Sequence, residues 1–212
     1  MSLPEAPQPH VQQRGACALI AIKERSRCKT RLSQALMPGA RAELVRSMLG
    51  AVLSAADAAR EVRQIIVVSP ERDTVSGDIP VLADNGKCLN SALTQAHRML
   101  RGLDCREVVI LPADLPNITS GDIDALVRAG RRGGFSLAPD TAGTGTNALC
   151  LFSSEPFRFL FGPDSKRLHL EEAERTGLQP VVVQLPGLAF DVDSPSDLHR
   201  LEQQQCHARL HV

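Results

Sequence analysis

The chain has 212 residues, a formal net charge of +0 and only 3% aromatic residues, with neither Trp nor Tyr. Balanced charge disfavours nonspecific binding of nucleic acid, and the scarcity of aromatics disfavours base-stacking platforms. Because no apolar run approaches the roughly 18–20 residues of a membrane span, we expect no membrane partner either.

Strand-like and helix-like segments alternate along the chain, which predicts an α/β fold with a mainly parallel sheet. The expected strands are Cys17–Ile22, Gln64–Ser69, Ile79–Ala83, Val108–Leu111, Phe135–Ala138, Asn147–Phe152 and Val181–Leu185. Five helices are expected. The first follows Pro38-Gly39, the second runs through Leu89–Leu100, and the third begins at a cap on Thr119 or Ser120. The fourth covers Leu168–Thr176, and the last starts at Pro195 after a cap at Ser194.

The chain reads as one folded domain with short ends. Residues 1–14 lack an apolar core and are expected to form a disordered leader, residues 15–205 the domain, and residues 206–212 a tail. Six cysteines without a Cys-x-x-Cys pair indicate reduced thiols in a cytoplasmic protein. Cys206, His207 and His211 could bind a metal, but they are expected to follow the last helix and fray.

A basic loop follows the first expected strand. Lys23, Lys29 and Arg31 stand where a doubly wound sheet commonly holds the phosphates of a nucleotide. The loop has neither a Walker A nor a Gly-x-Gly-x-x-Gly sequence, which disfavours P-loop and dinucleotide folds. The alternative is a solvated charged loop.

Three aspartates are the strongest functional signal. Asp114 follows the buried strand Val108–Leu111, and Asp191 and Asp193 are two residues apart, so on an extended backbone they face one side. All three are expected at strand ends, where carboxylates could hold a divalent cation that prefers oxygen ligands. The alternatives are a turn residue at Asp114 and a helix cap at Asp193.

Two loops of small residues could bind an anion. Gly143-Thr144-Gly145-Thr146-Asn147 offers backbone N–H groups and hydroxyls to a phosphate or carboxylate, although it could equally be a hairpin turn. Phe161-Gly162-Pro163-Asp164-Ser165 lies beside Lys166, Arg167 and His169, and could clasp an anionic group or cap a helix at Ser165.

These segments together resemble one family. Lys29-Thr30-Arg31-Leu32, Leu111–Pro116, Ala138–Leu149, Phe161–Ser165 and Asp191–Pro195 occur in the same order as in the 2-phospho-L-lactate guanylyltransferases of coenzyme F420 biosynthesis, which include phosphoenolpyruvate and 3-phosphoglycerate variants. The resemblance covers about Ala16 to Leu201. It implies a single-domain nucleotidyltransferase of the glycosyltransferase-A-like, Rossmann-like fold.

The resemblance also implies roles for individual residues. GTP would bind near Lys23, Lys29, Asn85 and Gly86, with Lys29, Arg31 and Asp114 catalytic. Mg²⁺ would be held by Asp114, Asp191 and Asp193, and a phosphorylated three-carbon acid by Thr146, Asn147, Gly162 and Ser165. The acid's phosphate would attack the α-phosphorus of GTP and release pyrophosphate. A homodimer is compatible with this resemblance, and the product would pass to a downstream deazaflavin transferase.

Two departures leave the acid open among 2-phospho-L-lactate, phosphoenolpyruvate and 3-phospho-D-glycerate. Lys166-Arg167 stands where relatives carry an aromatic or small residue, and Asn147 where some carry Thr. The extra cation favours an acid whose carboxylate lies farther from its phosphate. The alternatives are another nucleotidyltransferase, acting on a molybdopterin nucleotide or a sugar phosphate, and a noncatalytic nucleotide-binding subunit.

Overall fold

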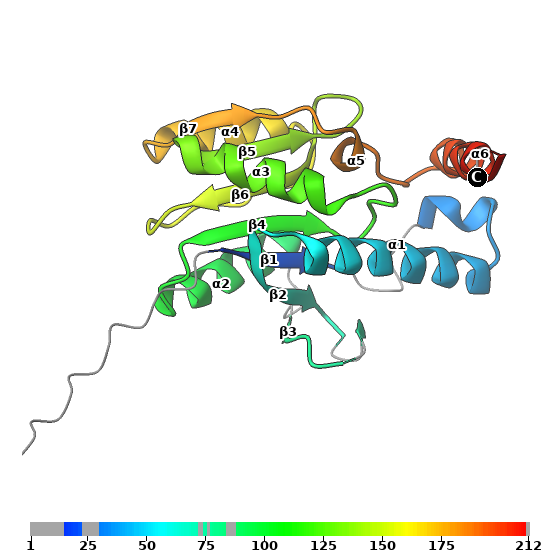
Figure 1. The fold of residues 1–212 in the computed structure, drawn as a ribbon, viewed down its shortest axis with the longest axis horizontal. Helices are drawn as coiled ribbons and strands as arrows, with labels where there is room; N and C mark the ends of the chain where they lie inside the picture. Colours follow the sequence, from blue (N-terminus) through cyan, green and yellow to red (C-terminus); the bar gives the residue numbers. More distant parts are fainter. Residues whose placement is uncertain (1–14, 23–29, 72–73, 76, 84–87, 211–212) are drawn as a thin grey trace, which may run out of the picture.

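The computed structural model describes residues 15–22, 30–71, 74–75, 77–83 and 88–210. Its strands are β1 (Ala16–Ala21), β2 (Val62–Ser69), β3 (Val81–Ala83), β4 (Glu107–Pro112), β5 (Gly134–Pro139), β6 (Thr146–Phe152) and β7 (Gln179–Val182). Its helices are the 3₁₀ helix η2 (Thr30–Gln34), α1 (Pro38–Ala58), α2 (Leu89–Gly102), α3 (Ser120–Gly133), α4 (Ser165–Arg175), α5 (Pro186–Ala189) and α6 (Pro195–Leu210). Figure 1 shows their arrangement.

The strands form one sheet in the order β3-β2-β1-β4-β6-β5-β7. All pairs are parallel except those that β6 makes with β4 and β5. Because β6 runs against β4, its first residues lie at the edge of the sheet where β4 ends. This reversal brings the start of β6 and the loop after β4 to one place, and it is the feature of the fold that positions the site.

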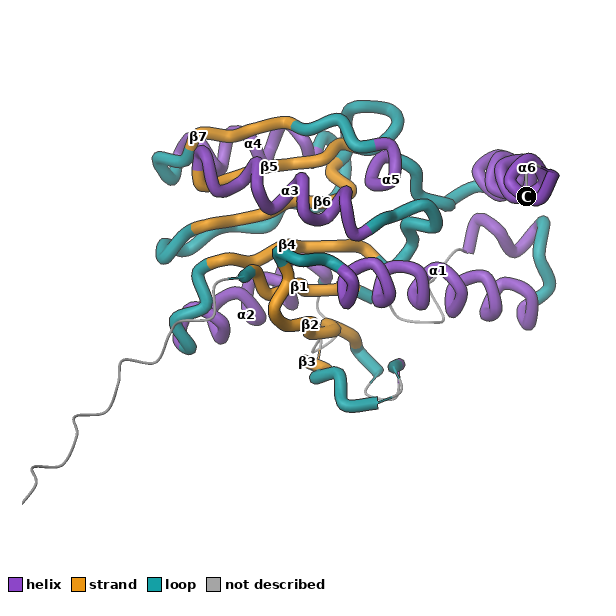
Figure 2. Tube along the Cα trace, in the orientation of Figure 1, coloured by secondary structure: helices purple, strands orange, loops and turns teal. Residues whose placement is uncertain are grey.

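Helices cover both faces of the sheet (Figure 2). One buried apolar cluster joins the sheet to α1, α3 and α5, and a second joins it to α2 and α4. The central strand β1 is buried at all six positions, as a strand with helices on both faces requires. A third, smaller cluster packs α6 against η2 and α1, beyond the edge of the sheet.

The predicted α/β fold with a mainly parallel sheet is confirmed, with every expected strand and helix present. Thr119 caps α3, with its hydroxyl accepting from the Asp122 N–H and the Asp122 carboxylate accepting from the Thr119 N–H. At α6, Ser194 accepts from the Asp197 N–H at 3.3 Å, as the expected cap. The cap at Asp193 that was considered is therefore not the one that forms.

Three expected boundaries are wrong. The strand expected at Val181–Leu185 ends at Val182, because Pro186 opens α5 four residues after it. β3 begins only at Val81, since Pro80 has no N–H to donate to a ladder. The last helix continues to Leu210 and contains Cys206, because the sequence after Leu201 offers neither Gly nor Pro to end it.

Other expectations concern the ends of the chain. The leader expected over residues 1–14 lies outside the described residues. Among the residues that are described, no helix has the length and apolar character that crossing a membrane would need.

Candidate active site

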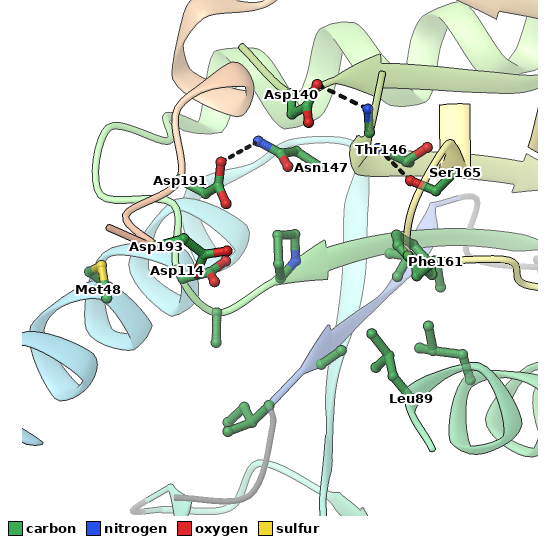
Figure 3. A pocket seen from close by; sticks show the side chains of 18 of the residues that line it. Met48, Leu89, Asp114, Asp140, Thr146, Asn147, Phe161, Ser165, Asp191 and Asp193 are labelled. Atoms are coloured by element: carbon green, nitrogen blue, oxygen red, sulfur yellow. Dashed lines mark hydrogen bonds between the residues drawn. The ribbon is translucent and has the colours of Figure 1, made fainter. Parts of the chain in front are cut away.

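A cavity of about 560 Å³ opens at the edge of the sheet where β1 and β4 end and β6 begins (Figure 3). Its walls also include residues from α1, α2 and the start of α4. Seven residues that were predicted to bind metal or substrate line it: Asp114, Thr146, Asn147, Gly162, Ser165, Asp191 and Asp193. Residues from four separate segments of the chain therefore meet in one cavity, and their binding roles stay predictions.

Three carboxylates meet at one end of this cavity. One oxygen atom from each of Asp114, Asp191 and Asp193 lies within 4.8 Å of the other two. All three residues are partly exposed, so a ligand can reach them. A cluster of carboxylate oxygens at this separation suits a hard divalent cation such as Mg²⁺. The donor set fits the expected ion, and Mg²⁺ binding stays a prediction.

Buried neighbours fix the direction of these carboxylates. Leu115, which follows Asp114, is 0% exposed and packs in the cluster of α1, α3 and α5. Val192 is also 0% exposed and packs with α6, whereas the flanking Asp191 and Asp193 are partly exposed and line the cavity. The burial of alternate residues thus aims the carboxylates into the cavity.

The expectation that all three aspartates follow strands is wrong for two of them. Asp114 lies two residues after β4, but Asp191 and Asp193 lie in the irregular segment between α5 and α6. The side-chain amide of Asn147 holds this segment. Its Nδ2 atom lies 3.0 Å from the Leu188 carbonyl oxygen, 2.9 Å from that of Ala189 and 3.4 Å from Asp191 Oδ1.

Two hydroxyls lie at the opposite end of the cavity (Figure 3). Ser165, at the start of α4, accepts a 2.9 Å hydrogen bond from the backbone N–H of Thr146, the first residue of β6. Thr146 Oγ1 lies 3.0 Å from Nδ1 of His169 on the same helix. Burial lowers the pKa of His169 to about 4, so the imidazole is neutral at pH 7.

The side chain of Asn90, on α2, makes two hydrogen bonds to the loop before α4. Asn90 Nδ2 donates to the Phe161 carbonyl oxygen at 3.0 Å, and its Oδ1 accepts from the Phe161 N–H at 2.9 Å. Gly162 follows with a φ of 138°, a conformation that favours glycine. Ser165 does not cap α4, whose N-cap is Asp164. The hydroxyl of Ser165 is therefore not used to cap α4 and can contact a ligand in the cavity.

The glycine loop is organised by a carboxylate within it. Asp140 Oδ1 accepts from the N–H groups of Thr144 and Gly145, at 3.1 and 3.0 Å. These two donors are therefore already engaged inside a β5–β6 hairpin, the alternative considered for this loop. The Lys166 N–H donates to the Thr144 carbonyl oxygen at 3.1 Å, and the Lys166 side chain is not part of the cavity wall.

Five predicted residues lie outside this description. Lys23, Lys29, Asn85 and Gly86 are not among the described residues, and neither is the side chain of Arg31, whose backbone belongs to η2. The nucleotide-binding roles expected of them stay predictions.

Three polar residues around the cavity were not singled out for these contacts: Asn90, Asp140 and His169. The hydrogen-bond partner of Asn90 is 71 residues away in the sequence. Those of Asp140 are 4 and 5 residues away, and those of His169 are 9 and 23 residues away. Only Asp140 has a local signal, because an Asp before a Gly-containing loop commonly accepts its backbone N–H groups. The other two depend on contacts between distant elements.

Comparisons with known proteins show the family to which the chain belongs. The family described as "Guanylyl transferase CofC like" matches residues 16–205. A phosphoenolpyruvate guanylyltransferase from Sphaerobacter thermophilus is 38% identical over 191 residues, which cover 87% of this chain and 91% of that protein. Another, from Rubrobacter xylanophilus, is 37% identical over 87% of this chain and 92% of its own length.

Solved structures agree on the fold. A nucleotidyl transferase from Methanothermobacter thermautotroptrophicus superposes with a TM-score of 0.61 at 16% identity, covering 92% of this chain and 99% of that one. At such low identity the likeness concerns the fold alone. The family match and the relatives at 37–38% identity identify an enzyme of the nucleotidyltransferase type.

Proposed function

The chain belongs to the CofC-like guanylyl transferase family, and from this premise we propose that it transfers GMP from GTP to the phosphate of phosphoenolpyruvate. The choice of acid rests on the names of two relatives that are 37–38% identical to this chain. The enzyme would act in the biosynthesis of coenzyme F420, where a deazaflavin transferase would consume its product.

The observation that carries this proposal is the division of the cavity. Asp114, Asp191 and Asp193 occupy one end, and the hydroxyls of Thr146 and Ser165 the other (Figure 3). Carboxylates that hold a cation suit the triphosphate, whereas uncharged donors suit the anionic acid without a buried countercharge. The cavity thus offers separate places for two anionic substrates.

The reaction would need alignment more than proton transfer. A phosphate oxygen of the acid forms a bond to the α-phosphorus of GTP, the bond from that phosphorus to the bridging oxygen breaks, and pyrophosphate leaves with the electron pair. Because a phosphate monoester is already anionic at pH 7, no strong base is required. Mg²⁺ held by the three aspartates would neutralise charge on the phosphates.

A single assay with separate substrates tests the proposal. The protein is incubated with GTP, Mg²⁺ and, in turn, phosphoenolpyruvate, 2-phospho-L-lactate and 3-phospho-D-glycerate, and the products are identified by mass. We expect pyrophosphate release and a guanylylated acid with phosphoenolpyruvate. Preference for another acid would correct the substrate, and parallel arms with ATP and CTP test the base. No product with any acid would refute the proposed activity.

A further inference from the structure

His169 lies behind the cavity wall, with both ring nitrogens engaged. Its side chain is 0% exposed on α4. Nε2 accepts a hydrogen bond from the backbone N–H of Leu160 at 2.8 Å, and Nδ1 lies 3.0 Å from Thr146 Oγ1. The ring of Phe161 packs edge-on against the imidazole, with the ring centroids 4.8 Å apart. The orientation of the imidazole is therefore fixed on several sides.

These partners determine where the proton of the imidazole resides. A backbone N–H can only donate, so Nε2 must present its lone pair to Leu160. A neutral imidazole then carries its proton on Nδ1, and Nδ1 donates to Thr146 Oγ1. The tautomer thus follows from an obligatory donor.

The direction of this bond determines what the Thr146 hydroxyl can do. Because Oγ1 accepts from His169, the hydroxyl proton remains available for another acceptor. Ser165 is in the same situation, since its Oγ accepts from the Thr146 N–H. Within the described part of the chain, neither hydroxyl proton has a recorded acceptor, and both side chains line the cavity. Two hydroxyl donors are thus available at the end opposite the carboxylates.

We propose that His169 is a positioning residue that makes the Thr146 hydroxyl a hydrogen-bond donor to an anionic oxygen of the acid substrate. The inference rests on the proposed function for the identity of that substrate, but its structural part does not. Uncharged donors of fixed direction favour an anion while leaving the carboxylate end to the nucleotide.

Two substitutions of His169 distinguish the roles of the two imidazole nitrogens. His169→Gln places an amide near the position of Nε2 and retains an acceptor for Leu160, but it removes the donor to Thr146. His169→Asn places an amide near Nδ1 and retains that donor, but it leaves the Leu160 N–H unpaired. His199→Gln, on an exposed face of α6, is the matched control.

The expected effects differ between the two variants. In His169→Gln the Michaelis constant for the acid should rise about tenfold or more, the cost of losing a donor to a charged group, while that for GTP stays within about twofold. In His169→Asn the acid constant should change less, but the melting temperature should fall. A merely structural role would instead weaken both substrates together.

A double substitution tests whether His169 acts through Thr146. The Michaelis constant for the acid in His169→Gln/Thr146→Val should be no higher than in Thr146→Val alone, because the hydroxyl that His169 directs is already gone. Additive losses would show that the two residues act independently, and would overturn the inference.

The tautomer of His169 can be measured directly in the wild-type protein, without an activity assay or a variant. In wild-type protein with ¹⁵N-labelled histidine, the His169 signals at pH 7 should show a neutral ring protonated at Nδ1. Protonation at Nε2, or at both nitrogens, would overturn the inference. If the wild type turned over none of the acids, the proposed function would fail, whereas the tautomer would still decide whether His169 donates to Thr146 and leaves the Thr146 hydroxyl proton available.

Discussion

The side-chain amide of Asn147 lies 3.4 Å from a carboxylate oxygen of Asp191 and also binds the last two residues of α5. Asn147 was predicted to bind the acid, yet its side-chain amide points to the carboxylates (Figure 3). One side chain thus connects the two ends of the site. This connection makes Asn147 a candidate for positioning Asp191.

We expect Asn147→Ala to raise the Mg²⁺ concentration needed for half-maximal pyrophosphate release. The reason is that Asp191 and α5 lose the amide that holds them, which should weaken the site by about 1–2 kcal/mol. A Mg²⁺ titration at saturating substrates measures the effect, and Asn117→Ala, an exposed amide, is the control. An effect on the acid alone would show that Asn147 binds substrate and does not position Asp191.

Asp114→Asn should reduce turnover to background while the protein remains folded. The amide keeps the shape of the side chain but lacks the charge that attracts a cation. Pyrophosphate release and thermal unfolding are measured in parallel, with Asp57→Asn on the exposed face of α1 as control. A wild-type rate in Asp114→Asn would show that Asp114 is a turn residue without a catalytic role.

Ser165→Ala should raise the Michaelis constant for the acid and leave that for GTP nearly unchanged. One donor to a charged group is lost, a cost of roughly 1.5–3 kcal/mol, and the buried Thr146 N–H loses its acceptor. Steady-state kinetics with each substrate varied separately measure the difference. A defect confined to GTP would mean that the two ends of the cavity have been assigned in reverse.

Gly187→Ala should destabilise the protein and impair activity. A Cβ atom at this position would lie 2.2 Å from an Asp122 oxygen and 2.8 Å from the Asn117 carbonyl oxygen, so α5 would have to move. Gly50→Ala is the control, because nothing lies within 4 Å of its Cβ position in the interior of α1. That change should stabilise by about 0.5–1 kcal/mol. Chemical denaturation distinguishes the two, and equal stability of both variants would contradict the close packing of α5.

The free energy of unfolding should fall as the pH drops from about 6.5 towards 4. Burial lowers the pKa values of His97 and His169 to about 4 each, with nearby Arg101 also lowering that of His97 and Glu172 opposing the shift at His169. The unfolded chain therefore binds more protons in this range, and the loss amounts to at most about 3 kcal/mol per histidine. Denaturation of wild type and His97→Gln at several pH values measures this loss of stability. The same pH dependence in the variant as in wild type would show that His97 does not contribute to it.

The sequence alone indicated the α/β fold, because apolar runs and helix caps are local signals. The apolar run of β1, the capping of α3 by Thr119 and the start of α6 after Ser194 all depend on residues that are neighbours in the sequence. The three aspartates were identified for the same reason, since a carboxylate after an apolar run, as at Asp114, and the Asp-x-Asp spacing of Asp191 and Asp193 are visible without a structure.

Only the tertiary structure decided how these residues meet. The reversal of β6 places Thr146 beside the end of β4, and α5 sets the position of Asp191, neither of which a local pattern specifies. The same holds for His169, whose proton is fixed by a backbone N–H nine residues away. The direction of a hydrogen bond depends on which groups packing brings together, and packing is a property of the whole chain.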